Sequence, residues 1–207
     1  MKKGIFIVVD GIDGSGKSEI VKMLHNYLFS KSKKYRILTT REPTNGVYGN
    51  KIREMLKNES DPLKSREMLL ELFIKDRQEH LKNTINPFIT NSKGNDLNII
   101  ICDRYYYSTI AFQGAQGLDM KALAGKNKKF RKPDRAFILD AEPSAALERI
   151  KYRQKEKFEQ LEFMNRIRKN FLMLPKMLPD NIKIIDSNRP LSEVFENIKK
   201  ELDSLME

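Results

Sequence analysis

The chain has 207 residues, enough to bury a sizeable core, and this length favours a single domain over residues 1–207. Its 39 Lys and Arg against 28 Asp and Glu give a net charge of +11, which suits an anionic partner or simply a charged, soluble surface. The single cysteine, Cys102, excludes an internal disulfide, and no apolar run is long enough to span a bilayer. We therefore expect a cytoplasmic protein that does not associate with membranes.

Apolar runs and segments of helical periodicity alternate along the chain. Strands are predicted at residues 4–9, 35–40, 97–102, 134–140 and 182–186. Helices are predicted at residues 17–30, 46–57, 63–85, 105–115, 119–126, 143–152, 160–174 and 191–206. The strand over 97–102 lacks polar alternation, which is typical of a parallel strand covered on both faces. The order of elements predicts an α/β fold of three layers, with a five-stranded parallel sheet flanked by helices.

A glycine-rich segment between the first strand and the first helix reads G-x-x-x-x-G-K-S. Glycines let a backbone curl so that its N–H groups point at phosphate oxygens, and a helix N-terminus adds a positive dipole. Lys17 is placed to reach the β- and γ-phosphates, and Ser18 to hold Mg²⁺. This context favours a nucleotide site over a chance turn. The expected ATP contacts are Gly11, Ile12, Asp13, Gly14, Ser15, Gly16, Lys17 and Ser18.

A second phosphate element, Asp103-Arg104-Tyr105, follows the third strand. Asp103 is the usual carboxylate partner of a phosphate loop, near Mg²⁺. Arg104 stands where water-activating ATPases usually place a glutamate, so transfer to an anionic acceptor is favoured over hydrolysis. The second pKa of a nucleoside monophosphate is about 6, so its phosphate oxygen is already a nucleophile at neutral pH and needs no general base. The alternative is a strand-end turn with a surface ion pair.

With these motifs, the chain resembles the thymidylate kinases of the bacterial and archaeal branch over nearly its whole length. The matching segments, in family order, are Asp10–Ser18, Thr40–Pro43, Lys51–Leu56, Leu72–Arg77 with His80, Asp103–Tyr105 through Ser108, Ala111–Gly114, Pro133-Asp134 and Leu139-Asp140. The resemblance implies a P-loop kinase that phosphorylates dTMP to dTDP with ATP and Mg²⁺. It also implies a homodimer joined through long apolar helices, for which residues 66–85 are the candidate.

The same resemblance implies an acceptor site. Phe73 and Arg77 are four residues apart on one face of a predicted helix; in the family, such a pair stacks on thymine and hydrogen-bonds a base carbonyl. A core Phe and a surface Arg are the alternative. A ring at Phe112 would clash with a 2′-hydroxyl, and His80 is interpreted as structural. The implied dTMP contacts are Asp13, Arg41, Pro43, Arg53, Phe73, Arg77, Arg104, Ser108, Thr109, Phe112 and Gln113.

The basic segment over about 149–160 resembles a lid that closes over ATP. Gly14 stands where one branch of the family carries an arginine, so this charge is expected from the lid. Arg153 is expected at the transferred phosphate and Arg149 nearer adenine, with Asn188 on the adenine side. A solvated run of charges is the alternative. Asp10 replaces a glutamate common in the family, and a structural function at the strand end is equally compatible.

Three rival functions are weighed against this interpretation. The nearest is a kinase of another substrate, such as dUMP, a purine monophosphate or a nucleoside. A regulatory GTPase requires Asn-Lys-x-Asp, and the segment 127–130 lacks the aspartate. A nucleic-acid-binding protein is suggested by the net charge and by the basic run 126–135, but it leaves the glycine loop unexplained. We expect that run to serve solubility or the acceptor side, with no stable nucleic-acid partner.

Overall fold

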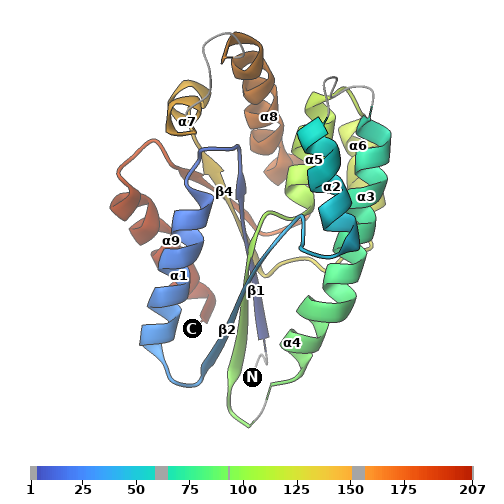
Figure 1. Ribbon diagram of the computed structural model, residues 1–207. Helices are drawn as coiled ribbons and strands as arrows, with labels where there is room; N and C mark the ends of the chain where they lie inside the picture. The colour runs from blue at the N-terminus through green and yellow to red at the C-terminus, as the bar shows by residue number, and fades with distance from the viewer. Residues whose placement is uncertain (1–3, 59–64, 93, 151–156, 207) are drawn as a thin grey trace.

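The computed structural model describes residues 4–58, 65–92, 94–150 and 157–206, with the backbone alone for 157–160. In the described chain, five strands form one parallel sheet in the order β2-β3-β1-β4-β5 (Figure 1). This arrangement confirms the predicted fold class. The strands are β1 (Gly4–Gly11), β2 (Tyr35–Arg41), β3 (Leu97–Asp103), β4 (Arg135–Asp140) and β5 (Ile182–Asp186).

Helices cover both faces of this sheet. Helices α1 and α9 lie on one face, and α3, α5 and α8 lie on the other (Figure 1). The helical bounds are α1 (Lys17–Lys31), α2 (Val47–Asn58), α3 (Arg66–His80), a π-helical turn η1 (Leu81–Ile85), α4 (Asn86–Thr90), α5 (Tyr106–Ala115), α6 (Met120–Asn127), α7 (Pro143–Arg149), α8 (Lys157–Met177) and α9 (Leu191–Met206).

The helix predicted at 63–85 differs most from the structure. Its first two residues lie outside the described residues, and the described helix begins at Arg66. The chain then stays helical through η1 and α4 to Thr90, and Pro87 lies in the first turn of α4, where proline is tolerated. The predicted end at Tyr152 lies outside the described residues, and α7 is described to Arg149.

The side chains of β1 alternate between two hydrophobic cores. Ile5, Ile7 and Val9 pack towards α1 and α9, whereas Phe6 and Val8 pack towards α5 and α8. Every residue of β1 is buried. Covering on both faces explains why strands of this sheet read as continuous apolar runs.

The register of the strands gathers the polar residues at one edge. Val9 pairs with Asp103, and Asp103 pairs with Arg41, so β1, β2 and β3 end side by side. The carboxyl ends of parallel strands form the usual ligand-binding edge of an open α/β sheet. Among the described residues, none of the helices has the length and apolar character needed to cross a membrane.

Candidate active site

The glycine-rich loop joins β1 to α1, as the sequence predicts. Gly14 has φ 77°, and a Cβ there would lie 2.2 Å from the carbonyl oxygen of Ala146, so only glycine fits. Lys17 begins α1 and folds back over the loop, with its Nζ donating to the carbonyl of Ile12 at 2.7 Å. Burial, and next the positive charge of Arg104, lower the pKa of Lys17 to about 8. Bound phosphate would favour its charged form.

A hydroxyl and a carboxylate meet beside this loop. The Oγ of Ser18 donates to the Oδ2 of Asp103 at 3.2 Å, while the other carboxylate oxygen, Oδ1, is buried without a hydrogen-bond partner in the described chain. An unsatisfied carboxylate oxygen next to a hydroxyl suits a hard divalent cation. Among the described residues, no group of three or more His, Cys, Asp or Glu is arranged so that it could hold a metal ion by itself. This hydroxyl and carboxylate fit Mg²⁺, which is commonly held by one or two carboxylates together with substrate phosphates.

Arg104 bridges the glycine loop and α5. It has φ 70°, and its guanidinium forms an ion pair with Asp13 and donates to the Oγ of Ser108 at 3.0 Å. The ring of Phe112 lies 5.4 Å from its Cζ. The unusual negative charge inside the loop therefore has a cationic partner.

Asp10, whose function the sequence leaves open, connects β1 to the start of α5. Its carboxylate accepts hydrogen bonds from the backbone N–H groups of Gly11 (2.8 Å), Tyr105 (3.1 Å) and Ser108 (3.0 Å), and from the Ser108 hydroxyl (2.6 Å). Burial raises the pKa of this carboxyl. Asp10 therefore satisfies donors at the N-terminus of α5 and fixes the segment that carries Arg104.

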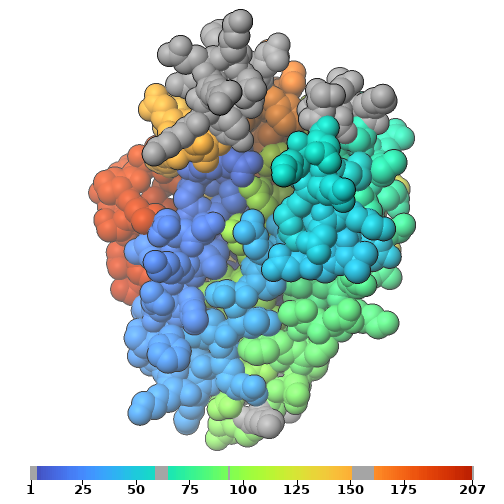
Figure 2. All heavy atoms as spheres, viewed as in Figure 1, coloured from blue at the N-terminus to red at the C-terminus, as the bar shows by residue number. Residues whose placement is uncertain are grey.

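The predicted acceptor residues converge on a cavity of about 410 Å³. Nine of the predicted residues line it: Asp13, Pro43, Phe73, Arg77, Arg104, Ser108, Thr109, Phe112 and Gln113. Five that the sequence interpretation does not include also line it: Glu42, Leu56, Tyr105, Gln116 and Phe163. Figure 2 shows a hollow between the blue atoms of α1 and the cyan atoms of α2, with lime-green atoms from the middle of the chain at its bottom.

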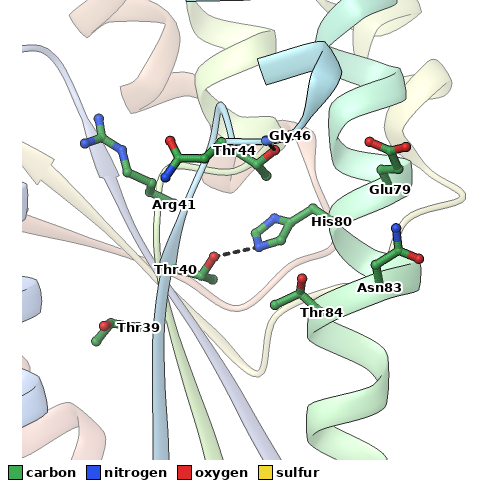
Figure 3. A pocket seen from close by; sticks show the side chains of 10 residues that line it. Thr39, Thr40, Arg41, Thr44, Gly46, Glu79, His80, Asn83 and Thr84 are labelled. Carbon is green, nitrogen blue, oxygen red and sulfur yellow. Dashed lines mark hydrogen bonds between the residues drawn. The ribbon is translucent and has the colours of Figure 1, made fainter. Parts of the chain in front are cut away.

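Arg77 is buried, so the alternative interpretation of a surface arginine is wrong. Only 1% of it is exposed. Its Nε donates to Glu42 Oε2 at 2.9 Å, its Nη1 to Asn127 Oδ1 at 2.7 Å, and its Nη2 to Thr109 Oγ1 at 2.9 Å. His80 continues this network, with Nδ1 3.1 Å from Glu42 and Nε2 2.7 Å from Thr40 (Figure 3). These contacts agree with a structural function for His80.

Two predicted phosphate contacts, Arg41 and Arg53, do not line the acceptor cavity. Figure 3 shows Arg41 at the end of β2 with its guanidinium turned away from His80, beside a separate hollow. Arg53 donates to the carbonyls of Pro43 (3.0 Å) and Thr44 (2.6 Å), so it holds the loop after β2. The observed contacts of Arg53 therefore position that loop. The phosphate contacts of Arg41 and Arg53 stay predictions.

A further hollow of about 510 Å³ lies on the other side of the glycine loop. It contains Ser15, Gly16, Arg149 and Asn188 among its lining residues. Arg149 donates to the carbonyl of Gly14 at 3.2 Å, so both residues predicted on the adenine side lie beside the loop. The buried hydroxyl of Ser187, which the sequence interpretation does not include, has no hydrogen-bond partner in the described chain. Arg153 lies outside the described residues.

A glycine loop with one hollow on each side, and an arginine at the start of the adjacent helix, defines a nucleotide phosphotransferase of the P-loop kinase class. The thymidylate kinase family matches residues 9–198. A probable thymidylate kinase of Archaeoglobus fulgidus is 35% identical over 98% of this chain and 96% of that protein. One of Pyrococcus horikoshii is 37% identical over 95% of this chain and 94% of that protein. The thymidylate kinase of Desulfotalea psychrophila is 39% identical over 79% of this chain and 78% of that protein.

The chain therefore belongs to the thymidylate kinase family, which confirms the resemblance drawn from its motifs. Family membership makes it a nucleoside monophosphate kinase. The GTPase and nucleic-acid-binding alternatives gain no support from these relatives.

Proposed function

We propose that this protein transfers the γ-phosphoryl group of ATP to dTMP, giving dTDP and ADP. One observation carries the proposal: nine of the eleven predicted acceptor residues line a single cavity, and two of them, Asp13 of the glycine loop and Arg104, form an ion pair. The γ-phosphate of ATP, held by the glycine loop, and the phosphate of dTMP, held in the cavity, would then meet beside the Asp13–Arg104 pair. Positioning and cationic stabilisation are the main requirements of phosphoryl transfer.

On the donor side, the N–H groups of the loop and the ammonium of Lys17 bind the ATP phosphates. Arg149 and Asn188 flank the adenine side. Ser18 and Asp103 are the residues that would hold Mg²⁺, which, when bound, neutralises phosphate charge. Arg153 is proposed to reach the transferred phosphate.

On the acceptor side, Phe73 stacks on the thymine ring, and Arg77 hydrogen-bonds a base carbonyl. Phe112 lies against the sugar and disfavours a 2′-hydroxyl. Arg104 binds the acceptor phosphate, whose own oxygen is the nucleophile, so no side chain has to remove a proton. As the bond between this oxygen and the γ-phosphorus forms, the bond to the ADP oxygen breaks.

The test is a coupled ADP-release assay with ATP, Mg²⁺ and one monophosphate at a time. We expect the highest kcat/KM with dTMP, lower values with dUMP and the purine monophosphates, and loss of activity in Arg153→Ala. A preference for another monophosphate would contradict the proposed functions of Phe73 and Arg77. Absence of acceptor-stimulated ADP release with every monophosphate would refute the reaction itself.

We further propose that the protein is a homodimer joined through α3. Met68 on this helix is 62% exposed, which is unusual for a large apolar side chain and suits a contact with a second copy. Light scattering coupled to gel filtration is expected to give twice the monomer mass for the unmodified protein. For Met68→Glu, the measured mass is expected to shift towards that of the monomer. A monomer mass for the unmodified protein would contradict this proposal.

A further inference from the structure

A separate cavity of about 290 Å³ shares no lining residue with the acceptor cavity, but it is lined by Asn127, a partner of Arg77. Its walls come from α5, α6, residues 128–132 and the turn after α8. The lining is mainly apolar, with the rings of Tyr106 and Phe130 and the aliphatic side chains of Ile110 and Leu178. Small-molecule sites of about 300 Å³ and more typically combine such walls with a few polar groups.

Two lysines of this cavity belong to the basic run 126–135, whose charged side chains the proposed reaction does not use. Lys128 and Lys132 both line it, and Lys128 is exposed. The opposing charge is Asp180, which accepts hydrogen bonds from the hydroxyls of Tyr106 and Tyr107 and lies 3.6 Å from Lys132. Two ammonium groups against one carboxylate that is already hydrogen-bonded leave the cavity positive.

The structure describes all residues from 126 to 135. None of them lines the acceptor cavity. Two members of the run are neutralised elsewhere, since Lys126 pairs with Glu71 and Arg135 with Glu201. The lysines that line the smaller cavity are therefore the part of the run best placed to meet a ligand.

We propose that this cavity is a second binding site for a small anion with an aromatic body. The aromatic body would pack between Tyr106 and Phe130, and a carboxylate, sulfonate or phosphate group would face Lys128 and Lys132. Gly125 provides the space, because a Cβ placed there meets no atom within 4 Å.

This site contacts the groups that hold Arg77. Asn127 lines the cavity and accepts from Arg77 Nη1 at 2.7 Å, and the ring of Phe130 lies 5.6 Å from the Arg77 Cζ. A ligand packed against Asn127 and Phe130 would change how firmly they fix the guanidinium. Occupancy would then alter the affinity for dTMP, a consequence that rests on the proposed function.

The binding test uses 8-anilinonaphthalene-1-sulfonate, an aromatic sulfonate whose fluorescence rises in apolar surroundings. The protein is titrated in saturating dTMP and ADP, which occupy the catalytic site. Gly125→Phe fills the cavity, and Lys128→Glu reverses its charge. Ala122→Phe and Lys121→Glu are matched controls, because both positions are exposed on α6 and lie outside the lining.

We expect saturable binding of one probe per chain, weakened about tenfold or more in Gly125→Phe and Lys128→Glu and unchanged in the controls. Equal affinity in all five proteins, or titrations that do not saturate, would overturn the site. All four variants lie outside the catalytic machinery, so their kcat for ADP release at saturating dTMP, without the probe, is expected to match that of the unmodified protein and reports that they are folded.

The connection to Arg77 is tested by the KM for dTMP at saturating probe. We expect a change of about threefold or more in the unmodified protein and in Ala122→Phe, and none in Gly125→Phe. An unchanged KM in the unmodified protein would overturn the connection. If the protein did not phosphorylate dTMP even without the probe, the proposed function would be refuted instead. In that case, the probe titration repeated with ADP alone would still show whether the second binding site exists.

Discussion

The carboxylate of Glu42 holds the guanidinium of Arg77, with its Oε2 2.9 Å from Nε and 2.7 Å from Nη2. Both side chains are buried, with 3% and 1% exposed. The second carboxylate oxygen of Glu42 lies 3.1 Å from the Nδ1 of His80. The chain therefore fixes the proposed base-contacting arginine before any acceptor binds, which is the preorganisation that a specific site needs.

Glu42→Gln is predicted to weaken acceptor binding and stability together. Removing the charge of one partner of a buried pair costs about 3–5 kcal/mol. We expect unfolding in urea to show a loss near the lower value, since the amide keeps the shape and one acceptor oxygen. The KM for dTMP should rise about tenfold, with the KM for ATP unchanged. Glu79→Gln on α3 is the control, and equal KM values for dTMP in the two variants would contradict the prediction.

Phe73→Leu tests stacking on the acceptor base. Leucine keeps the apolar character but loses the ring, and aromatic pairing contributes about 0.5–1.5 kcal/mol beyond area. The KM for dTMP is therefore expected to rise by about fivefold in steady-state assays. Phe29→Leu serves as the control because Phe29 is 72% exposed on α1, away from the cavity. A KM that matches this control would mean that Phe73 does not touch the base.

Phe112→Ala is predicted to relax discrimination against ribose. The ring lines the acceptor cavity, and its removal makes space for a 2′-hydroxyl. The ratio of kcat/KM for 5-methyluridine monophosphate to that for dTMP should rise by about tenfold. The rate with dTMP should also fall, because the ring lies 5.4 Å from the Arg104 guanidinium carbon. An unchanged ratio of the two substrates would place the sugar elsewhere.

The pKa of Lys17 predicts a pH dependence of ATP binding. Burial and Arg104 lower this pKa to about 8. Without ATP, the Lys17 side chain is therefore mostly charged below this pH and mostly neutral above it. Because phosphate favours the charged form, kcat/KM for ATP should fall as pH rises through about 8. Calorimetry in two buffers of different ionisation enthalpy should show proton uptake on ATP binding at high pH. Lys22→Gln, an exposed change on α1, should keep the profile, and a flat profile through this range would contradict the assignment.

Asp10→Asn is predicted to lower stability and turnover. An amide has one acceptor oxygen for the four hydrogen bonds that the carboxylate accepts, and hydrogen bonds to charged groups contribute about 1.5–3 kcal/mol each. We expect a loss of about 3 kcal/mol in urea unfolding and a lower kcat, because Ser108 also binds Arg104. Asp119→Asn is the control, since Asp119 makes one exposed N-cap bond and asparagine caps nearly as well. Equal losses of unfolding free energy and kcat in the two variants would contradict the view that Asp10 fixes the segment carrying Arg104.

The loop and the order of the elements could be predicted because their signals are local. The G-x-x-x-x-G-K-S spacing, the apolar runs and the helical periodicity are each read within a short segment of the chain. The five strands lie close to their predicted bounds, whereas the helix predicted at 63–85 continues to Thr90. The spacing of Phe73 and Arg77 predicts one helical face, and the structure brings both residues to the same cavity, whereas their contacts with the base stay a prediction.

By itself, the sequence determined the fold class, the family and most residues of the acceptor cavity, because local patterns and the order of motifs specify them. Only the tertiary structure decided which groups hold those residues in place. Glu42 meets Arg77 across 35 positions, Asn127 meets it across 50, and Asp10 meets Ser108 across 98. Such partners are chosen by the strand register and by helix packing, which bring distant segments together and leave no periodic signal in the chain.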